Sequence, residues 1–267
     1  MVASYQQEPI TLDGKPLEAS WQKSLPVIIH DPIANIDISL RAQHDGERLY
    51  LLASFADPQP NRAHKTLYWQ KQERRYLPGP EREDVFVVKW NMDPLPTNLS
   101  IRGGDPHVAD IWYWKAHRTD HAGFADDKRH IYAARPMPKA KPVLSLSGRT
   151  YYLQRPADRG RAAYQTTAFA TKREDRELMY ELQPPLGSRA DVQAKGYWHN
   201  GQWQVEFARK LNTGHSDDLQ MQQGGRYSFG ISRYEVAAKK INPELQQPLY
   251  GAGDIASMHS LFIMPSP

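Results

Sequence analysis

Six side chains of the types that bind metal ions lie within one short stretch of this sequence. They are His117, Asp120, His121, Asp126, Asp127 and His130. The spacing of His117 and His121 would place both imidazoles on one face of a helix, as in some transition-metal sites. The surrounding residues lack the apolar periodicity of a helix, so the sequence does not favour such a site. We expect Asp126 and Asp127 to organise a loop, through turn hydrogen bonds or around a bound cation.

The sequence contains no cysteine among its 267 residues, which excludes several kinds of chemistry. Disulfides, thiolate zinc sites, iron–sulfur clusters, thiol nucleophiles and covalently attached haem all require that residue. The motifs GxSxG and HExxH and the phosphate-binding loop are absent too, as is GxGxxG after a strand. Since no catalytic constellation is apparent, we expect the protein not to be an enzyme.

The balance of charge argues against a nucleic-acid-binding protein. The 34 Lys and Arg residues are opposed by 30 Asp and Glu, so the net charge is only +4 and the two signs are interspersed. No stretch approaches the roughly 20 apolar residues that a membrane span needs. The first 20 residues lack the apolar core of a signal peptide, which fits a cytoplasmic protein or one whose leader has been removed.

Short alternating segments bounded by turn residues predict the elements that must position these side chains. We expect strands over residues 36–42, 48–55, 84–90, 197–199, 202–209, 226–236 and 258–264. Asp45-Gly46 and Asn200-Gly201 should each form a two-residue hairpin turn, because these residues tolerate positive φ. Proline is spread along the chain, and this disfavours long helices.

Three irregular segments are expected to be long loops: residues 58–80, 93–106 and 118–142. The pair Asp217-Asp218 is expected to be a solvated turn. No repeat or linker divides the chain, so we predict an all-β protein. Its architecture should be a single antiparallel β-sandwich over residues 1–267, with long elaborated loops and little helix.

Several segments resemble one known family, in that family's order. Residues 109–127 read ADIWYWKAHRTDHAGFADD and are similar to the DIWHWKAxRxxxxGxADD signature of the haem-binding domain related to the ethylbenzene dehydrogenase gamma subunit. Residues 198–209 fit its WxNGxWxVxFxR pattern. Residues 10–21 and 45–57 resemble the opening of family 9 carbohydrate-binding modules and their DOMON-like relatives. Together the matching segments span nearly the whole chain.

The resemblance implies a β-sandwich that holds one haem between its sheets and passes single electrons. The gamma-subunit branch carries haem b with Met and Lys as axial ligands, whereas another branch attaches haem c through CxxCH. Because this chain has no cysteine, only non-covalent haem b is possible. The resemblance also implies a periplasmic location and a redox partner, either a molybdenum oxidoreductase complex or a cytochrome.

The axial ligands that the resemblance implies come from two segments. The first segment precedes the DIW signature, where His107 is the only strong haem ligand, with Met92 in reserve. The second is the entry to the last strand, where the family usually has Lys or His and this chain has Met258 and His259. Adjacent strand residues point to opposite faces, so only one of the two can reach a given pocket. The implied site is a haem iron bound by His107 and by either Met258 or His259.

Trp112 and Trp114 should share one face of an extended segment, with Tyr113 on the other. They would then pack in the core or form a wall beside the cofactor.

Two functions from other classes stay open. A haem-free sandwich could bind carbohydrate or another small ligand on its aromatic side chains, since the chain has 7 Trp and 14 Tyr. An interaction subunit that keeps the fold without a ligand is the remaining alternative.

Overall fold

The computed structural model describes residues 1–31, 34–234 and 258–267 of the chain. Its strands are β1 (Val2–Tyr5), β2 (Val27–Asp31), β3 (Ile36–His44), β4 (Arg48–Ala56), β5 (Leu67–Gln70), β6 (Arg75–Pro78), β7 (Val85–Asn91), β8 (His107–Lys115), β9 (Asp126–Ala133), β10 (Lys141–Leu144), β11 (Thr150–Gln154), β12 (Tyr164–Thr166), β13 (Arg176–Glu177), β14 (Tyr180–Leu182), β15 (Gln193–His199), β16 (Gln202–Lys210), β17 (Arg226–Tyr234) and β18 (His259–Ile263). Helix in these ranges is limited to α1 (Ala19–Lys23) and the 3₁₀ turns η1 (Asp120–Ala122) and η2 (Gly187–Ala190). None of the helices described is long and apolar enough to cross a bilayer.

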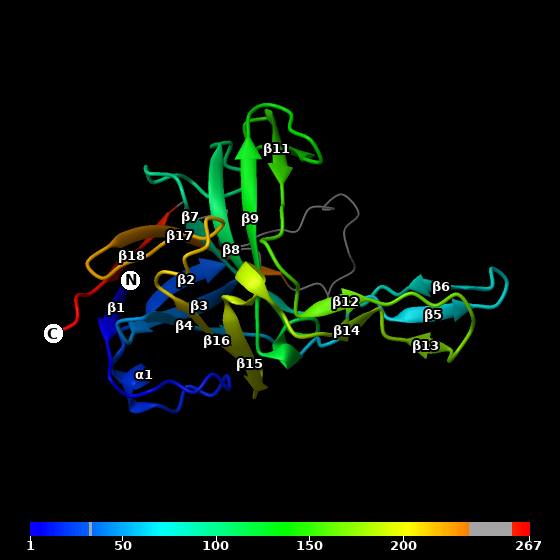
Figure 1. Ribbon diagram of the computed structural model, residues 1–267, viewed down its shortest axis with the longest axis horizontal. Helices are drawn as coiled ribbons and strands as arrows, with labels where there is room; N and C mark the ends of the chain where they lie inside the picture. Colours follow the sequence, from blue (N-terminus) through cyan, green and yellow to red (C-terminus); the bar gives the residue numbers. More distant parts are fainter. Residues whose placement is uncertain (32–33, 235–257) are drawn as a thin grey trace.

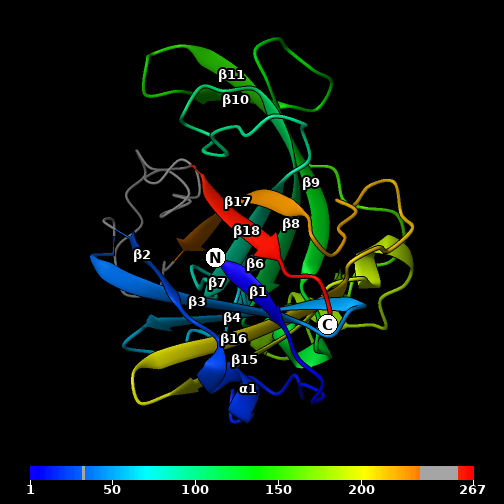
Figure 2. The same ribbon diagram turned by 90° about the vertical axis from the view of Figure 1, so that its left-hand side faces the viewer.

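Thirteen of the described strands form one continuous sheet that folds over on itself (Figure 1, Figure 2). Its order is β10-β11-β9-β8-β7-β17-β18-β1-β3-β4-β16-β15, and β2 pairs with β3 beside β1. The two halves pack face to face. Phe55 of β4 stacks on Phe86 of β7 with ring centroids 5.4 Å apart, and Trp114 of β8 meets Trp203 of β16 at 4.9 Å. The predicted all-β sandwich with little helix is therefore confirmed.

The sheet is not wholly antiparallel, and in this respect the prediction was wrong. Strand β1 runs parallel to both of its neighbours, β18 and β3. It lies between the two halves of the sheet, because β18 ends one half and β3 begins the other. The alternation of apolar residues could not reveal this, since it sets which face a strand buries but not the direction of its partner.

Strand β7 is buried at every position because the sheet has a core on each of its faces. Phe86, Val88 and Trp90 face the main core between the two halves. Val87 faces a second, smaller core on the outer side. That outer core is built from Leu99, Ile101, Ala109, Ile111, Tyr132, Val143, Tyr151 and Leu153. Segment 93–106 and the β10–β11 hairpin thus cover the outer face of β7, β8 and β9.

Of the three predicted loops, only residues 93–106 lack regular structure in the described chain. Residues 58–80 contain the β5–β6 hairpin, which β13 extends into a small sheet (Figure 1). Residues 118–142 contain η1 and the eight-residue strand β9. The loop prediction was wrong for these two segments. Strand β9 was missed because its sequence, DDKRHIYA, is highly charged, although several of those charges are buried.

The two hairpin predictions fared differently. Asn200 and Gly201 have φ of 48° and 78°, and His199 pairs with Gln202, so this is the expected two-residue turn with both φ positive. At the other hairpin His44 pairs with Leu49, so the loop is longer than predicted. Of the two predicted turn residues, Asp45 and Gly46, only Gly46 has a positive φ. The Asp45 carboxylate there accepts hydrogen bonds from later backbone N–H groups and closes the loop.

Candidate functional site

His107 is the side chain best prepared to bind a metal ion. It begins β8, is only 4% exposed, and faces the outer core. Its Nδ1 lies 2.8 Å from the carbonyl oxygen of Asp105, so Nδ1 carries the proton and donates it. Its Nε2 is buried and has no hydrogen-bond partner in the part of the chain that is described. Burial lowers the pKa of His107 to about 4, which keeps the ring neutral with a free lone pair.

The surroundings of His107 combine aromatic rings with buried basic groups. The ring of Tyr132 lies opposite, at 5.3 Å, and Tyr132 stacks on Tyr151 at 5.0 Å. Lys89 is fully buried on the same face and donates from Nζ to the carbonyl oxygen of Leu99. His130, also fully buried, lies diagonally across the β8–β9 pair, and burial holds its pKa well below the usual range. In β7, Lys89 lies on the same face as Val85 and Val87. This alternation was the sequence signal that could have predicted the buried lysine.

His259 lies on the inner face of the sheet. Its ring contacts Phe229 at 5.5 Å, and its Nε2 is buried without a hydrogen-bond partner among the described residues. Burial lowers the pKa of His259 as well. Met258, just before β18, is 47% exposed. Met92 follows β7 directly and is partly buried, and its N–H donates to the carbonyl oxygen of Val108.

The structure does not bring the two candidate histidines together. His259 pairs with Phe229, Phe229 with Trp90, and Trp90 with Asp110, so these four side chains share the inner face. His107 is three residues before Asp110 on β8 and therefore points to the opposite face. Three strand spacings, about 14 Å in all, also separate β8 from β18. One iron ion cannot bind both rings in this arrangement.

Trp112 and Trp114 both pack in the main core, on the face opposite His107. The Trp112 ring lies 5.2 Å from that of Trp90, with the guanidinium of Arg209 on another side. Trp114 donates from Nε1 to the Asp120 carboxylate at 2.9 Å. Both indoles therefore lie on the other face of β8 from the His107 ring.

The histidines and aspartates of segment 117–130 do not gather around one point, because several of them have hydrogen-bond partners elsewhere in the chain. Asp120 accepts hydrogen bonds from Trp114 and from the backbone of Gly196. Asp126 pairs with Lys115 and Arg189, and Lys115 helps to hold its pKa below the usual range against the effect of burial. His121 is exposed. Asp127 is different, because it joins carboxylates from other segments that the spacing alone did not connect.

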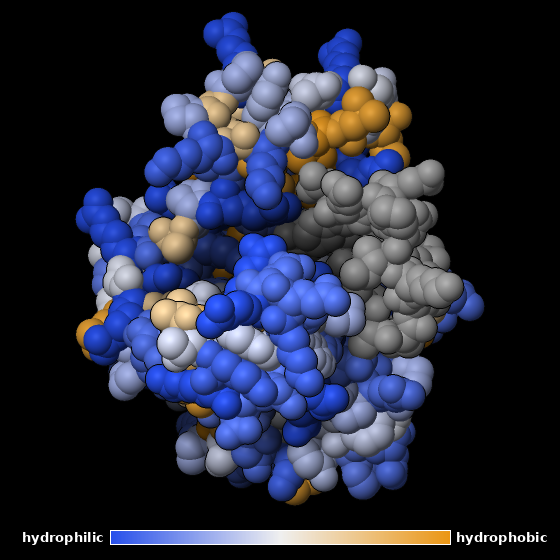
Figure 3. Space-filling model, turned by 90° about the vertical axis from the view of Figure 1, so that its right-hand side faces the viewer, coloured by the Kyte–Doolittle hydropathy of each residue, from blue (hydrophilic) through white to orange (hydrophobic). Residues whose placement is uncertain are grey.

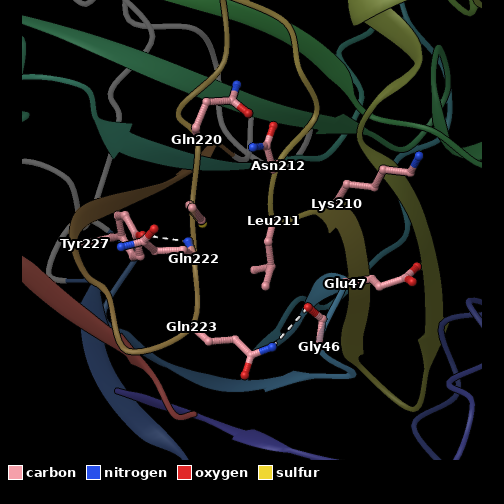
Figure 4. A pocket seen from close by; sticks show the side chains of 10 residues that line it. Gly46, Glu47, Lys210, Leu211, Asn212, Gln220, Gln222, Gln223 and Tyr227 are labelled. Atoms are coloured by element: carbon pink, nitrogen blue, oxygen red, sulfur yellow. Dashed lines mark hydrogen bonds between the residues drawn. The ribbon is translucent and has the colours of Figure 1, made fainter. Parts of the chain in front are cut away.

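Two open grooves lie away from these histidines. The larger, of about 910 Å³, is lined by several amide side chains; the backbone N–H of Gln222 donates to the Tyr227 hydroxyl, and Gln223 Nε2 donates to the carbonyl oxygen of Gly46 (Figure 4). The smaller, of about 620 Å³, is lined by Tyr197, among other residues, and Lys15 lies over its ring. The end of the molecule that carries the β5–β6 hairpin is mainly hydrophilic outside the grey residues (Figure 3). The amide and tyrosine side chains that line the two grooves could hydrogen bond to a polar ligand.

Comparison with known proteins identifies one family. The sequence model of the family described as ethylbenzene dehydrogenase matches residues 13–241. No curated protein matches the sequence. Among solved structures, a family 9 carbohydrate-binding module from Caldicellulosiruptor kristjanssonii is similar in its complexes with glucose and with cellotriose. Each is 10% identical with a TM-score of 0.45, and the match covers 100% of this chain and 96% or 94% of the other. A likeness this distant says nothing about the ligand of this chain.

Proposed function

Because this chain belongs to the ethylbenzene dehydrogenase family, we propose that it is a non-enzymatic electron-transfer protein that binds haem b without a covalent bond. The gamma-subunit branch of this family carries haem b and belongs to a molybdenum enzyme, and a chain without cysteine could hold only such non-covalent haem. A bound haem would supply a one-electron redox couple. The observation that supports this proposal within the chain is the state of His107.

His107 would be suited to bind the iron of a haem. Iron binds the deprotonated nitrogen of a neutral imidazole, and the ligand's other N–H commonly donates to a carbonyl group. His107 has this form, with Nδ1–H held by Asp105 and a bare, buried Nε2. The outer core beside it would exclude water from the bond.

The described residues do not present a preassembled ligand pair. His259 lies on the other face of the sheet, and Met258 is about half exposed to solvent. The proposal therefore assigns His107 to the iron and gives no role to Met92, Met258 or His259. It also gives Trp112 and Trp114 a packing role, since they lie on the opposite face from His107.

The proposed setting follows from the family. A single-electron carrier needs a redox partner. We propose that this partner is a molybdenum oxidoreductase complex or a cytochrome. We further propose a periplasmic location. A pull-down with the purified haem-loaded protein, followed by electron transfer between the isolated partners, tests both the partner and the direction of transfer.

Haem reconstitution tests the central proposal. We expect the apo-protein to bind one equivalent of haem, with a shifted Soret band and a reduced α-band. His107→Ala should lose this spectrum, whereas the matched variant His259→Ala should keep it, with circular dichroism showing that both are folded. Absence of binding by the wild-type protein would refute haem binding. If His259→Ala lost the haem spectrum and His107→Ala kept it, the iron ligand would be His259 on the inner face.

The grooves favour carbohydrate binding as a second candidate function. Amide side chains and Tyr227 line the larger groove, and Tyr197 lines the smaller, which are side-chain types that bind sugar hydroxyls and ring faces (Figure 4). Calorimetric titration with glucose and cello-oligosaccharides tests this function. Saturable binding that Tyr227→Ala or Tyr197→Ala removes would support it, and the absence of heat with every sugar would reject it.

A further inference from the structure

Five aspartates from separate parts of the chain meet on the inner side of β8 and β9. They are Asp110 of β8, Asp127 of β9, Asp158 of the segment after β11, and Asp217 and Asp218 of the segment after β16. All five are buried, the most exposed at 6%. The expectation of a solvated turn at Asp217-Asp218 was therefore wrong. Their burial requires an explanation, because a buried carboxylate is costly unless something compensates its charge.

Three of these carboxylates can touch a single ion. Asp110, Asp127 and Asp218 each place one oxygen so that all three oxygens lie within 4.8 Å of one another. Calcium binds carboxylate oxygens at about 2.3–2.6 Å, so two of its ligands can be at most about 5 Å apart. The spacing of the three oxygens meets this limit.

Several oxygens in the cluster have no hydrogen-bond donor. Both carboxylate oxygens of Asp127 are buried without a partner in the described ranges, although the residue is fully buried. The same holds for Oδ1 of Asp110. The oxygens of Asp158 likewise have no hydrogen-bond donor in geometric terms among the described residues; they lie near the Asp127 carboxyl and 3.9 Å from the Arg129 guanidinium. By contrast, Asp217 accepts from the Arg159 N–H and from the Ser188 hydroxyl, and Asp218 accepts from the hydroxyls of Ser188 and Thr213.

The nearby basic groups do not balance the cluster. Arg209 donates to Oδ2 of Asp110 at 2.5 Å and uses another nitrogen for the carbonyl oxygen of Leu219. Arg129 lies 3.9 Å from Asp158 and also acts electrostatically on Asp217. Among the described residues, these two arginines and the imidazole of His215 thus face five carboxylates.

We propose that Asp110, Asp127 and Asp218 bind one calcium ion, with Asp158 completing the acidic shell. The donors are all oxygens and come from two strands and an irregular segment, which suits the flexible coordination of calcium better than the strict octahedron of magnesium. No imidazole belongs to this group, so zinc and copper are disfavoured. The ion would tie the segment after β16 to β8 and β9. This inference is independent of haem binding.

Calcium-dependent stability tests the proposal in the whole chain. The protein is stripped with a chelator, and its melting temperature is measured with and without added CaCl₂ or MgCl₂. We expect about one calcium per chain by elemental analysis and a rise on the order of 5 °C at calcium about 100-fold above its dissociation constant. Magnesium should have a smaller effect. No calcium-dependent rise, together with no stoichiometric calcium, would overturn the proposal.

Isosteric variants locate the site. Asp127→Asn removes one charge without changing size, so it should abolish the calcium effect and leave the stripped protein at least as stable as the wild type. Asp217→Asn is the matched control, because Asp217 does not belong to the three carboxylates whose oxygens converge; it should keep the full calcium response.

A neighbouring group, Asp191, His215 and Asp218, shares one of the carboxylates. Asp191→Asn should also keep the response. If Asp191→Asn abolished it and Asp127→Asn did not, the proposed ligand set would be wrong.

Discussion

His107 and His259 belong to the same sheet, yet their rings point to its opposite faces from strands three steps apart. Each ring is partly or wholly buried, and each has a bare Nε2 among the described residues. In the described ranges, a carbonyl group fixes the other nitrogen of His107, and no such bond is seen for His259. The two histidines are therefore separate candidates for a ligand, and mutating one should not change the coordination offered by the other.

The first prediction concerns the protonation of His107 in the haem-free protein. Burial lowers its pKa to about 4, so the ring should stay neutral with Nδ1 protonated from about pH 8 to about pH 5. His215 is the contrast, because its hydrogen bond to Asp191 raises its pKa. Ring ¹⁵N NMR checks both residues. Protonation of His107 Nε2 near pH 6.5 would contradict the expected state.

The second prediction concerns the close approach of Gly196 to Trp114. A Cβ on Gly196 would lie 2.4 Å from the indole ring, which is itself held by Asp120 and by Trp203. We expect Gly196→Ala to lower the free energy of unfolding by about 1–3 kcal/mol. Gly230→Ala is the control, because its nearest neighbour would be at 3.7 Å, an ordinary contact. Urea denaturation measures both, and equal losses would show that the indole can move aside.

The third prediction follows from Glu206, which lies buried against the N-terminal segment. It accepts hydrogen bonds from Trp21 Nε1 and from the Gly14 N–H, and burial raises its pKa from 4.5 to about 7. The folded protein thus holds this proton more tightly than the unfolded chain. The resulting stability is complete below about pH 4.5 and is lost as the pH rises through about 7.

The variant Glu206→Gln should lack this dependence. The free energy of unfolding of this variant, measured relative to that of the wild type, should rise between about pH 5 and about pH 8. Chemical denaturation at both pH values gives the difference directly. A constant difference would mean that Glu206 is ionised throughout.

The fourth prediction concerns the buried ion pair of Arg233 and Asp57, whose nearest nitrogen and oxygen are 3.0 Å apart. Arg233→Met would leave a buried carboxylate without this partner, which we expect to cost about 3–5 kcal/mol. Adding Asp57→Asn to that variant should recover part of the loss. The exposed pair of His30 and Asp37 serves as the control, and Asp37→Asn should change stability by at most about 1 kcal/mol. Thermal unfolding measures these changes. The prediction would be wrong if Arg233→Met destabilised the protein no more than Asp37→Asn.

Local rules predicted what depends on neighbouring residues. Asn200 and Gly201 formed the expected turn because positive φ is a property of those two residues. The alternation of β7 and β8 correctly separated Trp112 and Trp114 from Tyr113. Strand β9 could not be found in this way. Its Asp126 is buried because Lys115, Tyr164 and Arg189 come from distant segments to meet it.

The candidate site was predictable only in part. His107 was found as the strongest ligand near the DIW signature, but nothing local indicated the face to which it points. The aspartate cluster was missed because Asp127 and Asp218 meet only through the fold, while each alone resembles a turn residue. Spacing within one segment cannot show which carboxylates from separate segments lie side by side.

The position of β1 between β18 and β3 has a consequence for how the chain folds. Residues near position 2 pair with residues near position 262, and the same short strand carries the connection to the other half of the sheet. Such pairing across nearly the whole sequence requires a large loop to close, and contacts of this kind form slowly. Each half can gain its hairpins early from local contacts. The pairing of β1 with both halves can form only after β18 is in place. We therefore expect this pairing to be the slow step in refolding.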